Sequence, residues 1–190
     1  MIRITSRCLL VGLLLQPSWW GHVVAQEVMW KSHIHAGAEA YQLGDLSEAE
    51  KEFQAAVDVA AEFGPEDPRL AMSLDYLAAL YQDQGRYAEA EPLYKQSLGI
   101  VENAVGPRHP FVAKSLDILA KFYCDQGLHA RAESLYQRAL TIRQEALPED
   151  HPDVVQSMEN YAAVLRQTGQ IEKADEIEAR AKAIRIRPAD

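Results

Sequence analysis

Cysteine and basic residues are both scarce in this sequence. Cys8 and Cys124 are the only cysteines among 190 residues, so a cysteine cluster that binds zinc is excluded. The 19 lysines and arginines are outnumbered by 28 aspartates and glutamates, which leaves a formal net charge of −9. A nucleic-acid-binding domain normally carries a basic surface, and this balance therefore argues against a nucleic-acid partner.

Motifs for catalysis and for metal binding are missing as well. The sequence has no HExxH motif, no glycine-rich phosphate loop and no serine in a nucleophile-elbow context. His33 and His35 would point about 200° apart on a helix, so they cannot bind one metal ion together. We therefore predict no metal, no cofactor and no catalytic residue. An enzyme that uses Cys124 with a histidine is the alternative, although a small buried side chain is the simpler interpretation of Cys124.

Long hydrophobic runs are absent except near the N-terminus. Two arginines precede an apolar run of eight residues, Cys8–Leu15, and residues of small or modest size lead up to Ala25. This layout predicts a secretory signal peptide over residues 1–25 that is cut after Ala25. The run is too short to span a membrane, and an uncleaved N-terminal anchor is the alternative. We expect an exported protein, periplasmic or secreted, that is held together by packing without an internal disulfide.

A repeat of 42 residues fills the rest of the chain. Gly85, Gly127 and Gly169 are 42 residues apart, and two further sets of residues follow the same step. A period of this length is typical of stacked supersecondary units, none of which can bury its apolar face alone. The two further sets are Ala90, Ala132 and Ala174, and Pro68, Pro110 and Pro152.

Apolar residues within each repeat recur every three or four positions, which is the period of an α-helix, and no stretch alternates as a strand does. A glycine ends a helix at little cost, and a proline suits the first position of the next helix. We therefore expect eight helices in four antiparallel pairs, the first starting near Val28. Small residues should let the paired helices approach closely. They are Gly37, Ala78, Ala120 and Ala162 in the first helices and Ala49, Ala90, Ala132 and Ala174 in the second helices.

The second repeat carries the clearest version of the pattern. Its fixed positions are Leu77, Ala78, Tyr81, Gly85, Ala90, Tyr94 and Ser97. This pattern resembles the tetratricopeptide repeat, and the 42-residue step with its terminal His-Pro pair is similar to the longer variant of kinesin light chain and its bacterial relatives. The resemblance covers about residues 31–186. It implies an all-α protein, a right-handed α-solenoid of about four stacked helix-turn-helix repeats with a concave, protein-binding face.

The resulting domain organisation places a divergent first repeat after the signal peptide. In the last repeat, Glu178 stands where the other repeats have an aromatic residue, which suits an end repeat that faces water. The predicted boundaries are 1–25 for the signal peptide, 26–67 for the first repeat, 68–109 and 110–151 for the next two, and 152–190 for the fourth repeat with its C-terminal cap.

The resemblance also implies which side chains line the concave face, because the first helix of each pair faces inward in this family. Acids align there in two rows, one of them Asp75, Asp117 and Glu159, and the rows favour a basic peptide or a peptide amino terminus as the partner. The full set of candidate partner-binding residues is Met72, Asp75, Tyr76, Ala79 and Asp83 in the second repeat, Lys114, Asp117, Ile118, Lys121 and Asp125 in the third, and Glu159, Asn160 and Arg166 in the fourth.

Each of these features also has a simpler structural interpretation. The acid rows are equally typical of a solvated helix face in an acidic protein. Tyr76 and Ile118 stand where the family often has asparagine, and they fit either an apolar contact with the partner or packing between neighbouring repeats. The basic residues near the C-terminus fit either an anionic partner or the dipole of the last helix.

Taken as a whole, the sequence predicts a noncatalytic scaffold that binds a peptide or protein in a concave groove. Nucleic acids and metal ions are excluded as partners, and a membrane is expected only if the N-terminal segment is uncleaved. The alternative function is a self-associating structural repeat module of the cell envelope that uses the loosely patterned first repeat.

Overall fold

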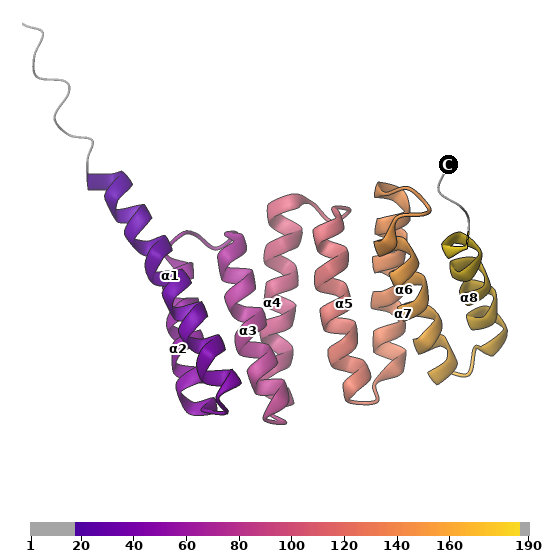
Figure 1. The fold of residues 1–190 in the computed structure, drawn as a ribbon, viewed down its shortest axis with the longest axis horizontal. Coiled ribbons are helices and arrows are strands. Elements are labelled where there is room, and N and C mark those ends of the chain that lie inside the picture. Colours follow the sequence, from indigo (N-terminus) through magenta and orange to yellow (C-terminus); the bar gives the residue numbers. More distant parts are fainter. Residues whose placement is uncertain (1–17, 187–190) are drawn as a thin grey trace, which may run out of the picture.

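Paired helices stand side by side in a single row (Figure 1). The computed structural model describes residues 18–186, and this part of the chain contains eight α-helices and no strand. The helices are α1 (Ser18–Gln42), α2 (Leu46–Ala61), α3 (Pro68–Asp83), α4 (Tyr87–Val105), α5 (Pro110–Asp125), α6 (His129–Ala146), α7 (Pro152–Gln167) and α8 (Ile171–Arg185).

Packing follows the order of the chain. The main contacts within pairs join α1 to α2, α3 to α4, α5 to α6 and α7 to α8, and each pair is joined to the next through α2 and α3, α4 and α5, or α6 and α7. An array in which each unit touches only its neighbours is a solenoid. The predicted all-α solenoid of four helix pairs is therefore confirmed.

The helix boundaries have the local causes that the sequence indicates. Asp67 Oδ1 accepts a hydrogen bond from the Arg69 N–H at 2.9 Å, which caps α3 ahead of its first residue, Pro68. The Nδ1 atoms of His109 and His151 do the same for α5 and α7 at 3.2 and 3.1 Å. The four turn glycines have φ values from 73° to 80°, a conformation that other residues rarely adopt. These glycines are Gly44, Gly85, Gly127 and Gly169.

The first helix begins earlier than predicted. It starts at Ser18 rather than near Val28, because no proline interrupts the segment between them and its single glycine costs a helix only about 1 kcal/mol. Most of the predicted signal peptide, residues 1–17, lies outside the described residues, and the predicted cut after Ala25 falls within α1. Nowhere in residues 18–186 is a helix both long and apolar enough to cross a membrane.

Small residues lie where paired helices come closest. The alanines predicted for these places, from Ala49 to Ala174, are fully buried at 0 % exposure. In the first repeat the place belongs to Gly37, and a Cβ atom added there would lie 2.6 Å from the Phe53 ring. The α1–α2 pair thus needs glycine at this position because Phe53 already fills the space.

Both ends of the array depart from the repeat pattern in ways that suit an end. Trp30 is buried in the first repeat, and its Nε1 donates a hydrogen bond to Ser73 Oγ at 2.8 Å, which ties α1 to α3. In the last repeat Glu178 faces solvent and accepts a hydrogen bond from Arg166 Nε at 3.0 Å. Position 178, which is aromatic in the other repeats, thus holds a glutamate that forms an ion pair with Arg166.

Candidate functional site

A cavity of about 550 Å³ lies between α3, the C-terminal half of α4 and α5. Six of the predicted partner-binding residues line it, all from the first helices of the second and third repeats. They are Met72, Asp75, Tyr76, Ala79, Lys114 and Ile118. The remaining lining residues are Pro68, Ala71, Tyr94, Val101, Ala104, Val105, Phe111 and Ser115.

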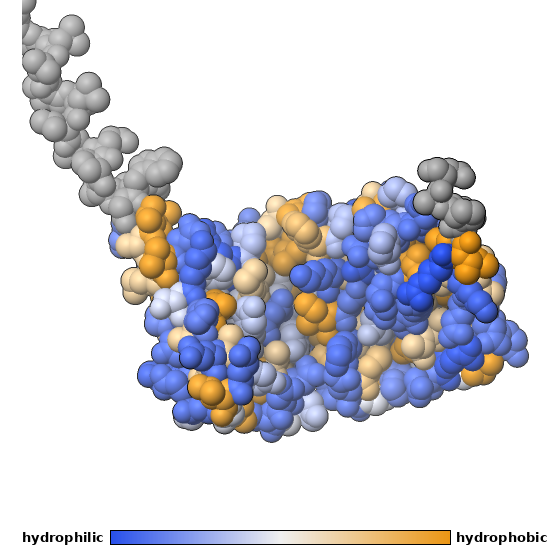
Figure 2. Space-filling view, in the orientation of Figure 1, coloured by the Kyte–Doolittle hydropathy of each residue, from blue (hydrophilic) through white to orange (hydrophobic). Residues whose placement is uncertain are grey.

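The wall of this cavity is mainly apolar and partly exposed. Phe111 is 63 % exposed and Met72 is 47 % exposed, although both are large apolar side chains. Tyr76 packs its ring against Phe53 with a centroid distance of 5.3 Å, so one face of that ring is held by the preceding repeat. Figure 2 shows apolar surface over the middle of the array, bordered by hydrophilic residues. Exposed apolar side chains of this kind are common at sites where proteins bind other proteins.

Sequence reasoning missed the contribution of the second helix. Val101, Ala104 and Val105, at the end of α4, were not among the candidate residues, because only the first helices were expected to face inward. Phe111, at the start of the first helix α5, was not among them either. The available signal was the pair of apolar residues, Val105 and Phe111, that flank the exposed loop between α4 and α5.

The three acids of the first row have different surroundings. Asp117 Oδ2 lies 2.6 Å from Nη1 of Arg143, and Glu159 Oε1 lies 2.9 Å from Nη1 of Arg185. Within the described part of the chain, no cationic nitrogen lies within 4.0 Å of Asp75, which is one of the residues that line the cavity. Two of the acids are thus already neutralised by arginines of their own repeat, and only Asp75 is open to an outside cation.

Asp75 is also the acid whose titration the fold changes most clearly. Burial raises the pKa of Asp75 to about 6, and the Ser97 hydroxyl and the Lys114 ammonium offset this increase only in part. The Ser97 Oγ atom is itself buried without a well-aligned hydrogen-bond partner. The cavity therefore contains a carboxylate that a positively charged ligand group would stabilise.

The other candidate residues lie away from the cavity and have partners within the chain. Tyr41 donates its hydroxyl hydrogen to Asp83, and Asp125 accepts from Lys121 Nζ at 2.7 Å and from Gln82 Nε2 at 2.8 Å. In the fourth repeat Asn160 Oδ1 accepts from Gln156 at 3.0 Å, and Arg166 pairs with Asp175 and Glu178. These contacts join turns of one helix or neighbouring helices, and they leave less of the second acid row available to a partner.

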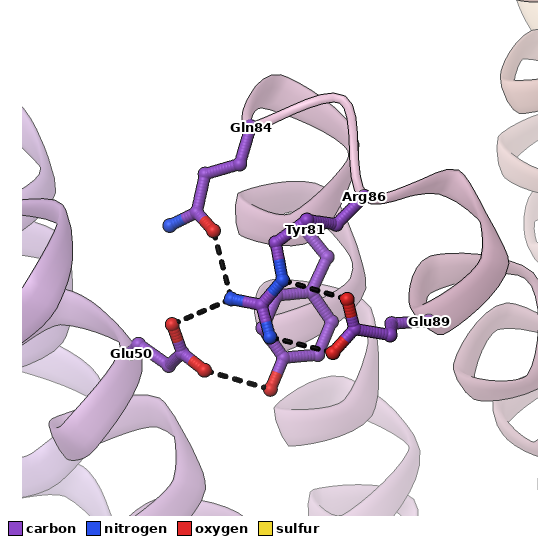
Figure 3. Close-up of polar contacts among 5 residues, drawn as sticks. All are labelled: Glu50, Tyr81, Gln84, Arg86 and Glu89. Atoms are coloured by element: carbon purple, nitrogen blue, oxygen red, sulfur yellow. Dashed lines mark hydrogen bonds and ion pairs between the residues drawn. The ribbon is translucent and has the colours of Figure 1, made fainter.

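A polar cluster at the junction of the first two repeats fixes how the repeats stack. Arg86 lies over the Tyr81 ring at 3.9 Å and is held by Glu50 at 2.7 Å and by Glu89 at 2.6 Å (Figure 3). Tyr81 donates to the other oxygen of Glu50 at 3.1 Å, and Gln84 accepts from Arg86 at 2.8 Å. These hydrogen bonds and ion pairs join α2 to α3 and α4, so the cluster contributes to the stacking of the first two repeats.

Cys124 and three of the histidines each have identified neighbours within the fold. Burial raises the pKa of the Cys124 thiol, and the nearby Asp125 raises it further, so the reactive thiolate is disfavoured. His109 and His151 cap helices, and His33 Nδ1 lies 2.7 Å from Glu52 Oε2. In residues 18–186 no three His, Cys, Asp or Glu side chains converge on a possible metal position.

Known proteins share this arrangement of repeats. A family model described as tetratricopeptide repeat matches residues 32–103, 73–121 and 111–187. The solved structure of BtubC (BKLC) from P. vanneervenii has a TM-score of 0.75 and 23 % sequence identity, over 87 % of this chain and 68 % of that chain. A putative kinesin light chain from Podosopora anserina with nearly identical TPR-like repeats has a TM-score of 0.72 and 25 % identity, over 82 % and 74 %.

A more distant structural likeness is to pilF of Pseudomonas aeruginosa. Its TM-score is 0.61 at 18 % identity, over 84 % of this chain and 63 % of that chain. Among curated proteins, no sequence matches the chain. The structural likenesses show a kinesin-light-chain-like repeat fold, and the chemistry of a ligand has to be inferred from the cavity itself.

Proposed function

Because the chain belongs to the tetratricopeptide repeat family, we propose that it is a noncatalytic scaffold that binds a peptide or protein segment in the groove formed by α3, α4 and α5. Stacked helical repeats of this kind generally offer an extended concave surface to a protein partner. The observation that carries the proposal is the cavity of about 550 Å³, whose large apolar side chains remain exposed in the isolated chain.

The groove fits a segment that combines apolar side chains with positive charge. Exposed groups such as Phe111 and Met72 would gain about 25 cal/mol for each Å² of apolar surface that a partner covers. The net charge of −9 attracts basic segments and repels acidic ones, which affects both the association rate and the choice of partner. Asp75 supplies the charge inside the groove itself.

A matched pair of substitutions tests this proposal. Ala79 is exposed and lines the cavity, so Ala79→Trp should fill it, whereas Ala88 is exposed in the first turn of α4 and does not line it. Polypeptides retained from a native cell extract by the wild type should also be retained by Ala88→Trp and lost with Ala79→Trp, as measured by mass spectrometry. Circular dichroism checks that both variants fold. Equal retention by all three proteins would contradict binding in this groove.

We also propose that the protein is exported, on the basis of residues 1–25 of the sequence alone. The test is the mass of the N-terminal peptide of the protein purified from fractionated cells. Export predicts a mature chain that starts at Gln26 in the periplasmic or secreted fraction. A chain with its leader intact in the cytosolic fraction would contradict this.

A self-associating structural module of the cell envelope is the second candidate function. It is favoured by exposed apolar side chains near the start of α1, where Val24 is 56 % exposed, Val28 is 62 % exposed and Met29 is 51 % exposed. Light scattering over a range of concentrations separates the two candidates. The scaffold proposal predicts the mass of one chain throughout, whereas self-association predicts a mass that rises with concentration.

A further inference from the structure

The 42-residue register reveals a difference between repeats at the end of the second helix. Positions 101, 143 and 185 are equivalent, and they hold Val101, Arg143 and Arg185. The first helices place an acid opposite each of them. These acids are Asp75, Asp117 and Glu159.

In the third repeat, the arginine is built into the fold. Arg143 is only 8 % exposed, its Nη1 lies 2.6 Å from Asp117 Oδ2, and the same nitrogen donates to Ser157 Oγ. The side chain thus reaches from α6 to α5 and to α7, and its guanidinium fills the space between the two inner helices. A planar guanidinium suits this place because it can donate to a carboxylate and to a hydroxyl at once.

The fourth repeat keeps the same pair at the open end of the array. Arg185 Nη1 lies 2.9 Å from Glu159 Oε1, and the two side chains are 60 % and 33 % exposed. The acid and the arginine therefore meet with or without a following repeat. The contact joins the two helices of one repeat, α7 and α8, and does not require a neighbouring repeat.

The second repeat has the acid but not the arginine. Val101 is too short to reach Asp75, and Ser115, the equivalent of Ser157, donates its hydroxyl hydrogen to the Phe111 carbonyl oxygen at 3.5 Å, which leaves its own oxygen able to accept. Val101, Asp75 and Ser115 all line the cavity of about 550 Å³. The cavity thus occupies the place in the second repeat that corresponds to the Arg143 guanidinium in the third.

We propose that this cavity binds the side chain of an arginine from a partner polypeptide, with its guanidinium between Asp75 and Ser115. The inference rests on the proposed function, since it names the side chain by which a peptide in the groove would be recognised. The bound arginine would make the contacts that Arg143 makes within the chain one repeat later.

The lining of the cavity favours arginine over other side chains. Ala104 and Val105 offer an apolar wall for the three methylene groups of the stem, and the planar Tyr76 ring offers a surface for a guanidinium. Lysine carries a point charge without the planar fork, so it is less suited to bridging a carboxylate and a hydroxyl. An apolar side chain would bury Asp75 further without a cation, which is costly. Lys114 lies at the cavity and acts on Asp75 through its longer-range charge.

The test starts from a random peptide library displayed on phage and selected on the full wild-type chain. Each selected peptide is then synthesised in two forms, with arginine and with citrulline, which is a neutral analogue of the same shape. We expect an arginine at a fixed position in the selected peptides. The change to citrulline should weaken binding to the wild type about tenfold or more, as is typical when a charged hydrogen bond to a buried group is lost.

Two variants of the chain then test whether the arginine of the peptide binds beside Asp75. Asp75→Asn keeps the shape of the cavity and should bind the arginine and citrulline peptides equally. Val101→Arg supplies the missing arginine from within the chain, as at position 143, and should bind neither peptide. If Val101→Arg does not fold, Asp75→Asn still decides the question.

The possible negative results distinguish a failure of this inference from a failure of the proposed function. Selected peptides without a fixed arginine, or an arginine preference that persists in Asp75→Asn, would overturn this inference and leave groove binding intact. No selected peptide at all would contradict the proposed function together with this inference. A wild-type dimer that Val101→Arg disperses would assign the cavity to an arginine of a second copy, and would overturn its assignment to a separate partner.

Discussion

The three acids of the inner row occupy one position in the repeat but have different neighbours. Asp117 is paired with a buried arginine, Glu159 with an exposed one, and Asp75 with none within 4.0 Å in the described part of the chain. An acid that is buried without a cation destabilises the fold at neutral pH and is available to a ligand. At the residue scale, the cavity therefore lies in the repeat that keeps the acid of this ion pair but has Val101 in place of the arginine.

The titration of Asp75 gives a first prediction. The folded pKa of about 6 lies above the ordinary 3.8, so the fold favours the protonated form. The contribution of Asp75 to stability is thus largest below about pH 4 and is lost as the pH rises through about 6. Asp75→Asn should be more stable than the wild type at pH 7, by about 1 to 3 kcal/mol, and the difference should shrink toward pH 4.

Urea unfolding of both proteins at several pH values measures this difference. The groups that face Asp75 from the neighbouring helices, Tyr94 and Ser97 on α4 and Lys114 on α5, are the same in the two proteins. The pH-dependent part of the difference therefore reports the ionisation of Asp75 among these neighbours. A difference in the free energy of unfolding that does not change with pH would contradict the raised pKa of Asp75.

The two arginines of the ion-pair row give a second prediction. Arg143→Ala leaves Asp117 largely buried without its cation and should cost about 3 kcal/mol of stability. Arg185→Ala removes a pair in which the arginine is 60 % exposed, and should cost less than about 1 kcal/mol. The free energy of unfolding in urea measures both, and equal losses would show that burial of the pair is not what matters.

At the scale of helices, short polar contacts recur between one repeat and the next. Tyr81 donates to Glu50 at 3.1 Å, and the equivalent Tyr123 donates to Glu91 at 2.8 Å. In the fourth repeat Leu165 replaces the tyrosine, and Gln170 donates to Glu133 at 2.8 Å instead. Each second helix is thus joined through a glutamate to the repeat that follows, in addition to the apolar packing.

Removal of one such contact gives a third prediction. Tyr81→Phe keeps the partly buried ring and deletes only the hydrogen bond to Glu50, so it should cost about 0.5 to 1.5 kcal/mol. Tyr76→Phe is the matched control, because Tyr76 is exposed and no hydrogen bond of its hydroxyl is formed within residues 18–186. Thermal unfolding should show a lower melting temperature for Tyr81→Phe alone. Equal effects of the two substitutions would rule out a stacking role for the tyrosine hydroxyl.

The approach of α1 and α2 gives a fourth prediction. Gly37→Ala places a Cβ atom 2.6 Å from the Phe53 ring, so overpacking should outweigh the better helix propensity of alanine, with a net loss of about 1 to 2 kcal/mol. Gly99 is the control, since it lies within α4 and has open space around it. Gly99→Ala should stabilise the protein by about 0.5 to 1 kcal/mol. Stabilisation by both substitutions would show that the first pair is loosely packed.

The helices themselves were predictable because their signals are local. The prolines, the capping residues ahead of them and the turn glycines act within a few residues, and the 42-residue step repeats them. The start of α1 was predicted wrongly because the segment before Val28 has no breaker to mark a boundary. Six of the candidate residues on α3 and α5 line the cavity, because the helical period places them on one face of each helix.

The partners of the acids were not predictable from the first helices alone. Which side chain reaches Asp117 depends on how the end of α6 lies against α5, and that geometry is not encoded in local periodicity. The alignment of Val101 with Arg143 and Arg185 was visible in the sequence, but it gains a meaning only when each acid is known to face that position.

At the scale of the whole molecule, the four helix pairs share a common packing of small buried residues and consecutive helix contacts. The cavity of about 550 Å³ occurs where the second and third repeats meet. A solenoid of identical units would offer the same weak site several times. Val101, in place of the arginine found at positions 143 and 185, distinguishes this site from its equivalents, as the proposed binding of a partner arginine requires.

The most direct test of groove binding is a map of the backbone amide shifts in nuclear magnetic resonance spectra when a selected peptide saturates the full chain. Binding in the groove predicts that the largest changes fall in α3, in the last turns of α4 and in α5, around Tyr76, Val105 and Ile118. It would be contradicted if the largest changes fell in α6 to α8, or if they spread evenly along the array.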